Sequence, residues 1–262
     1  MMQSILSGDG VSLHVRDEGS KAAQVLMLSN SLGTDIRVWE LMLKHLTGSY
    51  RIVRYDKRGH GLSDCPDAPY SMDQLVSDAE TIADTLQLNN IHFVGLSIGG
   101  LIGQGLAAKR PELIRSLVLM DTAAKIGTAA MWEERIAVLR KGGLAGMADA
   151  ILDRWFTKPL RQNKNDLAVW RNMVMRTPLE GYIACCHAIA GADLRESTAS
   201  LQMPVMGIAG DKDVATPPLV VEETVKLCGG RFSLVEGAGH LPCVEQPKIT
   251  AQLIEEFIQQ AT

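Results

Sequence analysis

The sequence lacks the features that would assign it to a membrane, to nucleic acid or to a disulfide-rich class. No apolar run approaches the length of a transmembrane helix, and its start, MMQSILSGDGVSLHV, lacks the basic segment and apolar stretch of a secretory signal. The net charge of −4 is too mild to favour a nucleic-acid or membrane-surface partner. No repeat or low-complexity segment stands out, so we expect a globular chain that can bury a large core.

The cysteines of the sequence indicate neither a metal site nor a set of disulfide bonds. The five cysteines are scattered, odd in number and without a C-x-x-C pair, which argues against a zinc or redox motif. We therefore expect free thiols in a reducing cytoplasm. No other set of metal-ligand residues clusters along the chain, and the sequence predicts neither a metal nor a cofactor. The oligomeric state stays open.

Apolar runs alternate with helix-like segments through the first half of the chain. The runs are continuous, as in strands buried on both faces, and cover 23–30, 50–56, 91–97 and 114–121. Helix-like segments lie between them, at 38–46, 71–88 and 98–109. An alternating strand over 11–19 precedes them all. This order favours an α/β fold, with a mostly parallel sheet flanked by helices.

The pattern changes in the middle of the chain. Residues 124–196 show helical periodicity without a buried strand, and strand-then-loop units return at 204–213 and 232–240. A closing helix follows over 249–260. The sequence thus predicts one α/β core, made of 1–123 and 197–262, interrupted by a helical cap at 124–196. In such sheets the chemistry lies beyond the carboxyl ends of the strands.

A serine lies at one of these strand ends. The segment GLSIGG, residues 95–100, fits G-x-S-x-G, follows the apolar run IHFV and precedes a helix-like run. In this context the glycines permit a tight strand-to-helix turn that lifts the hydroxyl of Ser97 above the sheet. The turn also aims the start of the helix, and the N–H of Ile98, at the reacting carbonyl. We expect Ser97 to be a nucleophile.

A nucleophilic serine needs a base, and the base needs an orienting acid. His240 follows the last predicted strand in a loop of small residues, GAGH, so we expect it to be the base. Asp213 and Asp121 each follow a predicted strand, and position alone permits either as the acid. Asp213 is favoured because it gives the order Ser97, Asp213, His240. His60 lies in the glycine-bounded loop DKRGHGLSD, where it either lines the site or caps the turn.

An early loop supplies the other half of an oxyanion hole. The segment LSNSLGTD, residues 28–35, follows a predicted buried strand and is made of small and turn-forming residues. Such a loop leaves backbone N–H groups free to converge on an oxyanion. We expect the N–H of Leu32 to act together with that of Ile98. The alternative is a plain tight turn.

Five motifs in order, NSLGTD, DKRGHGLSD, GLSIGG, GDKDVATPP and GAGH, resemble the α/β-hydrolase superfamily over nearly the whole chain. The helical insertion is similar to that superfamily's cap, which lies over the site. Many members carry His-Gly in the oxyanion loop, where this chain has Asn30-Ser31. Asn-Ser is typical of a narrower group that the chain also resembles, the 3-oxoadipate enol-lactonases. That resemblance implies hydrolysis of a small anionic lactone to 3-oxoadipate by a serine, histidine and aspartate, without a cofactor, in bacterial aromatic catabolism.

The substrate of such a lactonase carries a carboxylate, so its pocket needs a cation. The insertion has eleven Lys and Arg against eight acids, a net +3, which leaves −7 for the rest of the chain. Arg135 and Arg154 are the preferred carboxylate ligands, because each neighbours a tryptophan and an arginine can bind a carboxylate through two hydrogen bonds. Those tryptophans, Trp132 and Trp155, either line the pocket or form the core of the cap.

Two alternatives stay open at this stage. A related serine hydrolase, such as a general carboxylesterase or a cofactor-free perhydrolase of the haloperoxidase type, would share the same motifs. Some proteins of this fold instead act as ligand receptors with slow or no turnover, since a fold does not determine a function. An intact Ser97, Asp213 and His240 argues against a receptor.

Overall fold

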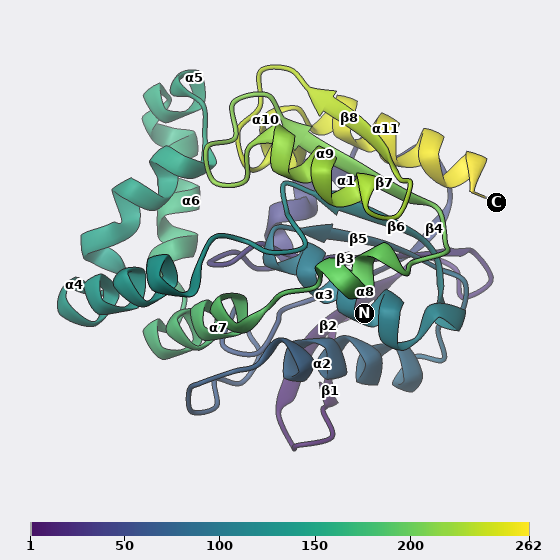
Figure 1. The fold of residues 1–262 in the computed structure, drawn as a ribbon, viewed down its shortest axis with the longest axis horizontal. Coiled ribbons are helices and arrows are strands. Elements are labelled where there is room, and N and C mark those ends of the chain that lie inside the picture. Colours follow the sequence, from purple (N-terminus) through teal and green to yellow (C-terminus); the bar gives the residue numbers. More distant parts are fainter. Residues whose placement is uncertain (1, 262) are drawn as a thin grey trace.

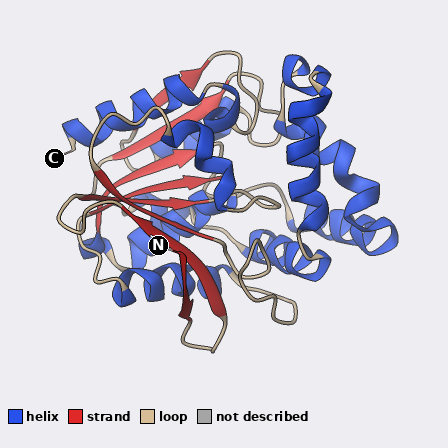
Figure 2. Ribbon diagram, turned by 180° about the vertical axis from the view of Figure 1, so that it is seen from behind, coloured by secondary structure: helices blue, strands red, loops and turns tan. Residues whose placement is uncertain are grey.

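The computed structural model describes residues 2–261, which form one twisted eight-stranded sheet with helices on both sides (Figures 1 and 2). The strand order is β1-β2-β4-β3-β5-β6-β7-β8. The strands are β1 Met2–Leu6, β2 Ser12–Glu18, β3 Gln24–Ser29, β4 Tyr50–Tyr55, β5 Ile91–Leu96, β6 Ile114–Met120, β7 Val205–Gly210 and β8 Arg231–Val235. Strands β1 and β2 pair antiparallel, and β3 to β8 are parallel to one another.

Burial explains why the central strands are so apolar. Strands β5 and β7 are buried at every position, because helices cover both faces of a parallel sheet. Helices α2 and α3 pack together on one face, and α1 and α11 pack together on the other (Figures 1 and 2). The helices of the core are α1 Glu40–Leu43, α2 Met72–Thr85, α3 Ile98–Lys109, α8 Arg195–Ala199, α9 Pro218–Lys226, α10 Pro242–Glu245 and α11 Pro247–Gln260.

Helices α4 to α7 gather beyond the carboxyl ends of the strands, as a group set apart from the sheet (Figure 1). We call them the cap helices. They are α4 Ala129–Trp155, α5 Lys158–Gln162, α6 Lys164–Arg176 and α7 Leu179–Gly191. The chain leaves the core and returns to it at adjacent points, since the N–H of Leu194 donates to the carbonyl of Ala124 at 2.8 Å.

Helix α4 is bent at Gly143, which has φ 62° and ψ −175°. One glycine in a conformation that other residues avoid accounts for the break between the two halves of α4. A straight helix would hold residues 135 and 154 about 28 Å apart. The bend instead lets both halves face the core.

Several elements differ from the sequence-based prediction. The expected helix at 38–46 is a short 3-10 helix, Ile36–Trp39, followed by the one turn of α1. Strand β1 and helices α7 and α9 were not predicted at all. Helix α8 packs on the core rather than on the cap helices, because Thr198 Oγ1 donates to Gln104 Oε1 of α3 at 2.7 Å. Among residues 2–261, no helix combines the length and the apolarity needed to cross a membrane.

Candidate active site

Ser97 lies on the turn between β5 and α3, with φ 58° and ψ −118°. A positive φ is uncommon for a residue other than glycine and stores strain at functional sites. Two hydrogen bonds to β6 and the loop after it hold the turn: the N–H of Ser97 donates to Met120 O at 2.9 Å, and Thr122 Oγ1 donates to Ser97 O at 2.7 Å. The predicted strand-to-helix turn is therefore present.

Two glycines of the motif are required by close backbone contacts. A Cβ at residue 95 would lie 2.2 Å from the carbonyl oxygen of Gly99, and one at residue 99 would lie 2.1 Å from Ser29 O. Both distances are far below van der Waals contact. Ser97 can be presented in this way only because its neighbours in the motif have no side chain.

His240 and Asp213 are joined by a hydrogen bond of 2.8 Å between Nδ1 and Oδ2. Both side chains are buried, and Thr216 Oγ1 donates to the same carboxylate oxygen at 2.7 Å. Burial raises the pKa of Asp213, but His240, Thr216 and the N–H of Ala215 lower it further, so its net pKa lies below the usual value. Asp213 is therefore a carboxylate aimed at Nδ1, which leaves Nε2 of His240 for a reacting group.

Asp121, the competing acid, is fully buried beside Asp213. Its Oδ1 accepts the N–H of Gly210 at 2.9 Å, and within residues 2–261 its Oδ2 forms no hydrogen bond. Burial, together with the negative charge of Asp213, holds the pKa of Asp121 well above its usual value. This environment favours the protonated form of Asp121, while the bond to His240 is made by Asp213.

Ser97 and His240 line one small cavity of about 50 Å³ between the sheet and the cap helices. Leu32 lines it from the loop after β3, and Arg135 and Arg154 line it from α4. The structure thus brings the predicted nucleophile, base, oxyanion loop and cap arginines to a single enclosed space.

Two backbone donors are free here, one in Leu32, which lines the cavity, and one in Ile98, which follows Ser97 in the chain. Within residues 2–261, neither the N–H of Leu32 nor that of Ile98 donates to a protein acceptor. Ile98 is the first residue of α3, so its N–H also carries the positive end of the helix dipole. Free N–H groups beside a serine are the arrangement that stabilises an oxyanion.

Side chains from two other segments hold the oxyanion loop in place. Asn30 Oδ1 accepts Nε1–H of Trp39 at 3.1 Å, and Nε2 of His60 accepts the N–H of Gly33 at 3.0 Å. Burial lowers the pKa of His60 well below its usual value, so the ring is neutral and can accept. The Asn-Ser variant of this loop is therefore supported by side chains, and His60 fastens the loop rather than taking part in proton transfer.

Arg135 is held between aromatic rings on the cap side of the cavity. Its guanidinium lies 5.6 Å from the ring centre of Trp132 and 5.7 Å from that of Tyr182, and Nη2 donates to Tyr182 Oη at 2.6 Å. Its Nε is buried without a partner, and Arg135 pairs with no carboxylate among residues 2–261. A partly buried cation without a counterion favours an anionic ligand.

Arg154 adds a second positive charge to the same cavity. Incomplete hydration and the like charge of Arg135 lower the pKa of Arg154, although its side chain stays exposed to solvent. Trp132 and Trp155 line the cavity as well, and Trp155 also anchors the cap helices, because its carbonyl accepts the N–H of His240 at 2.8 Å. Next to it, Thr157 Oγ1 donates to Glu245 Oε1 at 2.6 Å. The cap helices are therefore fastened directly to the loop that carries His240.

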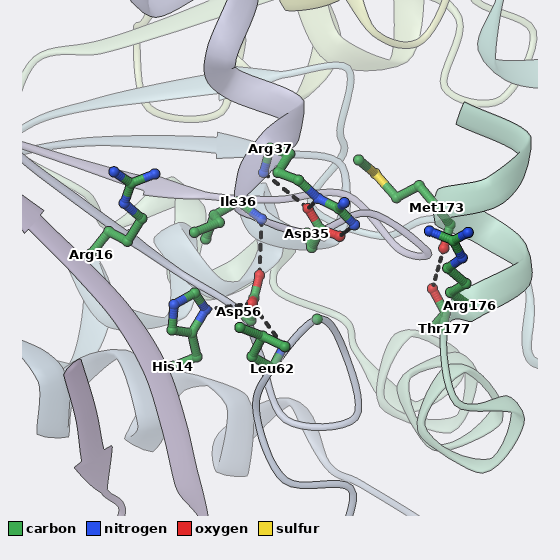
Figure 3. Close-up of a pocket in the computed structure, with 11 residues that line it drawn as sticks. His14, Arg16, Asp35, Ile36, Arg37, Asp56, Leu62, Met173, Arg176 and Thr177 are labelled. Atoms are coloured by element: carbon green, nitrogen blue, oxygen red, sulfur yellow. Dashed lines mark hydrogen bonds and ion pairs between the residues drawn. The ribbon is translucent and has the colours of Figure 1, made fainter. Parts of the chain in front are cut away.

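A second hollow of about 550 Å³ lies on the other side of the oxyanion loop, between that loop and α6 (Figure 3). At its base, Asp56 accepts His14 Nδ1 at 2.7 Å and the N–H groups of Ile36 and Leu62 (Figure 3). Its arginines are mostly paired, as Arg37 is with Asp35. Asp56 thus joins the oxyanion loop to the loop of His60, and the catalytic candidates lie elsewhere.

Only one group of possible metal ligands emerges among residues 2–261, and it is formed by Asp121, Asp213 and His240. Their ligand atoms lie within 4.8 Å of one another, a cluster that the sequence spacing does not indicate. The Nδ1 of His240 is already bonded to Asp213, and a metal would have to replace that bond. The hydrogen bonds that are present account for the cluster.

The sheet, the strained serine turn and the buried acid–histidine pair define an α/β hydrolase. The chain belongs to the alpha/beta hydrolase family, whose model matches residues 25–253.

Individual members of this family resemble the chain over nearly its whole length. The chain is 34% identical to 3-oxoadipate enol-lactonase 2 of Acinetobacter baylyi, with 97% of this chain and 96% of that protein covered. Among solved structures it is similar to the enol-lactonase from Burkholderia xenovorans, with a TM-score of 0.93, 34% identity and coverage of 98% and 100%. A hydrolase from Pseudomonas aeruginosa is 35% identical, with a TM-score of 0.94 and 98% of each chain covered. These full-length similarities support a hydrolase.

Sequence reasoning missed three residues that shape the site: Thr216, Tyr182 and Lys57. Thr216 follows Asp213 by three residues, a spacing that permits a side-chain bond within a turn. Tyr182 lies in the unpredicted helix α7, so no signal pointed to it. Lys57 lies within a charged motif, where a lysine is ordinarily exposed, yet it is 1% exposed here.

Proposed function

We propose that this protein is a serine hydrolase that opens 3-oxoadipate enol-lactone to 3-oxoadipate. One combination of features carries the proposal: a serine that has free N–H donors near it, and, in the same cavity, an arginine that pairs with no carboxylate among residues 2–261. The first feature fits acyl transfer, and the second fits a substrate that bears a carboxylate. The relatives that are named as enol-lactonases support the same substrate.

In the first step, His240 takes the proton of Ser97 as its oxygen attacks the lactone carbonyl. The N–H groups of Leu32 and Ile98 stabilise the oxyanion, and Asp213 stabilises the imidazolium. Collapse of this intermediate breaks the ring C–O bond and expels an enolate, which becomes a ketone when it is protonated. The product remains attached to Ser97 as an ester.

In the second step, His240 removes a proton from water, and the resulting hydroxide attacks the ester carbonyl. The same two N–H groups stabilise the second oxyanion. When this intermediate collapses, the acid is released and Ser97 recovers its proton from His240. The net reaction consumes one water, and every proton transfer passes through the imidazole.

Arg135 would bind the substrate carboxylate through its unpartnered Nε, while Trp132 and Tyr182 hold the guanidinium in place. Arg154 would add its charge from the other half of α4. Residues 124–196 act in this proposal as a cap that selects the substrate, and the core supplies the chemistry.

Steady-state hydrolysis of 3-oxoadipate enol-lactone by the wild type and by Ser97→Ala tests both parts. We expect a loss of at least ~10⁴-fold in kcat for the variant, because the nucleophile is absent. Equal rates for the two proteins would refute the serine mechanism. A wild type that hydrolyses p-nitrophenyl acetate but not the lactone would refute the substrate alone, and would favour a general carboxylesterase.

A further inference from the structure

Lys57 is a fully buried lysine that the proposed chemistry does not yet use. Its side chain is 1% exposed, and its Nζ donates to the carbonyl oxygen of Ser31 at 2.7 Å. Within residues 2–261 it forms no ion pair with a carboxylate. An ammonium group buried with so little compensation costs stability, and its presence calls for a function.

The carbonyl that Lys57 contacts belongs to a particular peptide unit. The same planar amide that ends in Ser31 C=O carries, on its other side, the N–H of Leu32. That N–H is free and lies at the cavity of Ser97. A cation that donates a hydrogen bond to an amide oxygen draws electron density from the amide nitrogen. The N–H of that amide then becomes a stronger hydrogen-bond donor.

We infer that Lys57 is a positioning residue that polarises the Ser31–Leu32 peptide and so strengthens one of the two oxyanion donors. This inference rests on the proposed function, because it concerns the oxyanion of that reaction. Thr34 Oγ1 also donates to Ser31 O, at 2.9 Å, which fixes the carbonyl between two donors. Lys57 differs from Thr34 in bringing a full charge.

Groups around Lys57 set the pH range over which it acts. Burial lowers the pKa of Lys57 to about 8, although Cys185 of α7, Asp56 and Asp35 act in the opposite direction. Burial raises the pKa of Cys185 to about 12 and lowers that of His60 well below its usual value, so neither of these two groups titrates near this pH. Deprotonation of Lys57 would remove the charge and leave a weaker, neutral donor.

The test compares Lys57→Met with Lys44→Met, a matched change at an exposed lysine. At pH 7 we expect Lys57→Met to lower kcat roughly five- to tenfold with KM unchanged, because the polarised donor acts on the oxyanion more than on the bound substrate. Lys44→Met should match the wild type. Methylboronic acid forms a tetrahedral adduct with a serine. Its inhibition constant should rise in Lys57→Met by the same factor by which kcat falls.

The pH profile separates this role from a merely structural one. After subtraction of spontaneous hydrolysis, wild-type kcat should fall across pH 8 to a plateau near that of Lys57→Met, and the variant should show no such step. The variant should also be the more stable protein at pH 7. This stability advantage should shrink as the pH rises through 8, because the buried charge that destabilises the wild type is then lost.

Two outcomes would overturn the inference while the serine mechanism stands: a Ser97-dependent wild type whose kcat is matched within twofold by Lys57→Met, or a wild-type kcat without a step between pH 7 and 9.5. If Lys57→Met does not fold, the same two criteria apply to kcat of Lys57→Gln and to the pH dependence of wild-type kcat. A wild type no faster than Ser97→Ala would instead indicate failure of the proposed function.

Discussion

The cavity has a core wall, formed by the strand-end loops, and a cap wall, formed by α4. The two walls differ in how their polar side chains are paired within the protein. On the core side, the acid–base pair is buried and hydrogen-bonded, and Ser97 is held by hydrogen bonds to Met120 and Thr122. On the cap side, Arg135 and Arg154 lie on one bent helix, and neither forms an ion pair with a carboxylate of residues 2–261. In the proposed function, the core wall supplies the reaction and the cap wall binds the anionic end of the substrate. Substitutions can therefore test each wall alone.

The largest expected effect in this comparison is at the acid of the core wall. Asp213→Asn should lower kcat by about 10⁴-fold on every ester substrate, because an amide favours the wrong tautomer of His240. Asp211→Asn is the matched control, because Asp211 accepts the N–H groups of Gly237 and Ala238 rather than the ring of His240, and the amide oxygen of asparagine can accept the same bonds; this variant should retain most activity. Steady-state kinetics on the lactone and on p-nitrophenyl acetate measure both. Comparable activity of Asp213→Asn and wild type would contradict the assignment of the acid.

An intermediate effect is expected on the cap wall. Arg135→Met should lower kcat/KM for the anionic lactone by about 10- to 100-fold, which corresponds to the loss of a charged hydrogen bond, while p-nitrophenyl acetate hydrolysis changes little. Arg140→Met, an exposed position on the same helix, is the control. An equal loss on both substrates would mean that Arg135 supports the chemistry, and the division between the two walls would fail.

The smallest effect on activity is expected at Asp121. Because Asp213 makes the bond to His240 and the raised pKa of Asp121 favours its uncharged form, Asp121→Asn should keep kcat within about tenfold of the wild type, in contrast to Asp213→Asn. Its effect on stability should depend on pH. The raised pKa means that folded Asp121 retains a proton that the unfolded chain releases above about pH 4, so wild-type stability falls with rising pH there.

Urea unfolding at pH 4 and pH 7 checks this sign. Asp121→Asn has no proton to lose, so its stability relative to the wild type should increase between the two pH values. A relative stability that is constant with pH would mean that Asp121 titrates normally.

Much of the core wall could be predicted because its determinants are local. Apolar runs indicated the buried strands, and the glycines around Ser97 indicated a turn whose geometry excludes side chains. Asp213 and His240 each follow a strand, and parallel strands bring such loops to one edge. Asp213 was preferred to Asp121 as the acid because of its order in the chain. Position at a strand end could not separate the two, since both lie at the same edge of the sheet.

The cap wall was predicted only in part because its determinants are tertiary. Arg135 and Arg154 were identified from charge and from adjacent tryptophans, but Tyr182 comes from an unpredicted helix and makes the contact that orients Arg135. Trp155 was expected as pocket lining or core, and it does both; that its carbonyl also anchors the His240 loop was not predicted. The burial of Lys57 likewise depends on how α7 packs over the loop after β4. No pattern within either segment of the sequence predicts that contact.

The hydrogen bond between Leu194 and Ala124 places both ends of the intervening segment at one point on the core. A segment attached in this way can lengthen, shorten or be exchanged for another without changing the distance that the sheet must bridge. Substrate range in such an architecture can diverge through the inserted helices, while the strand-end loops keep the same reaction.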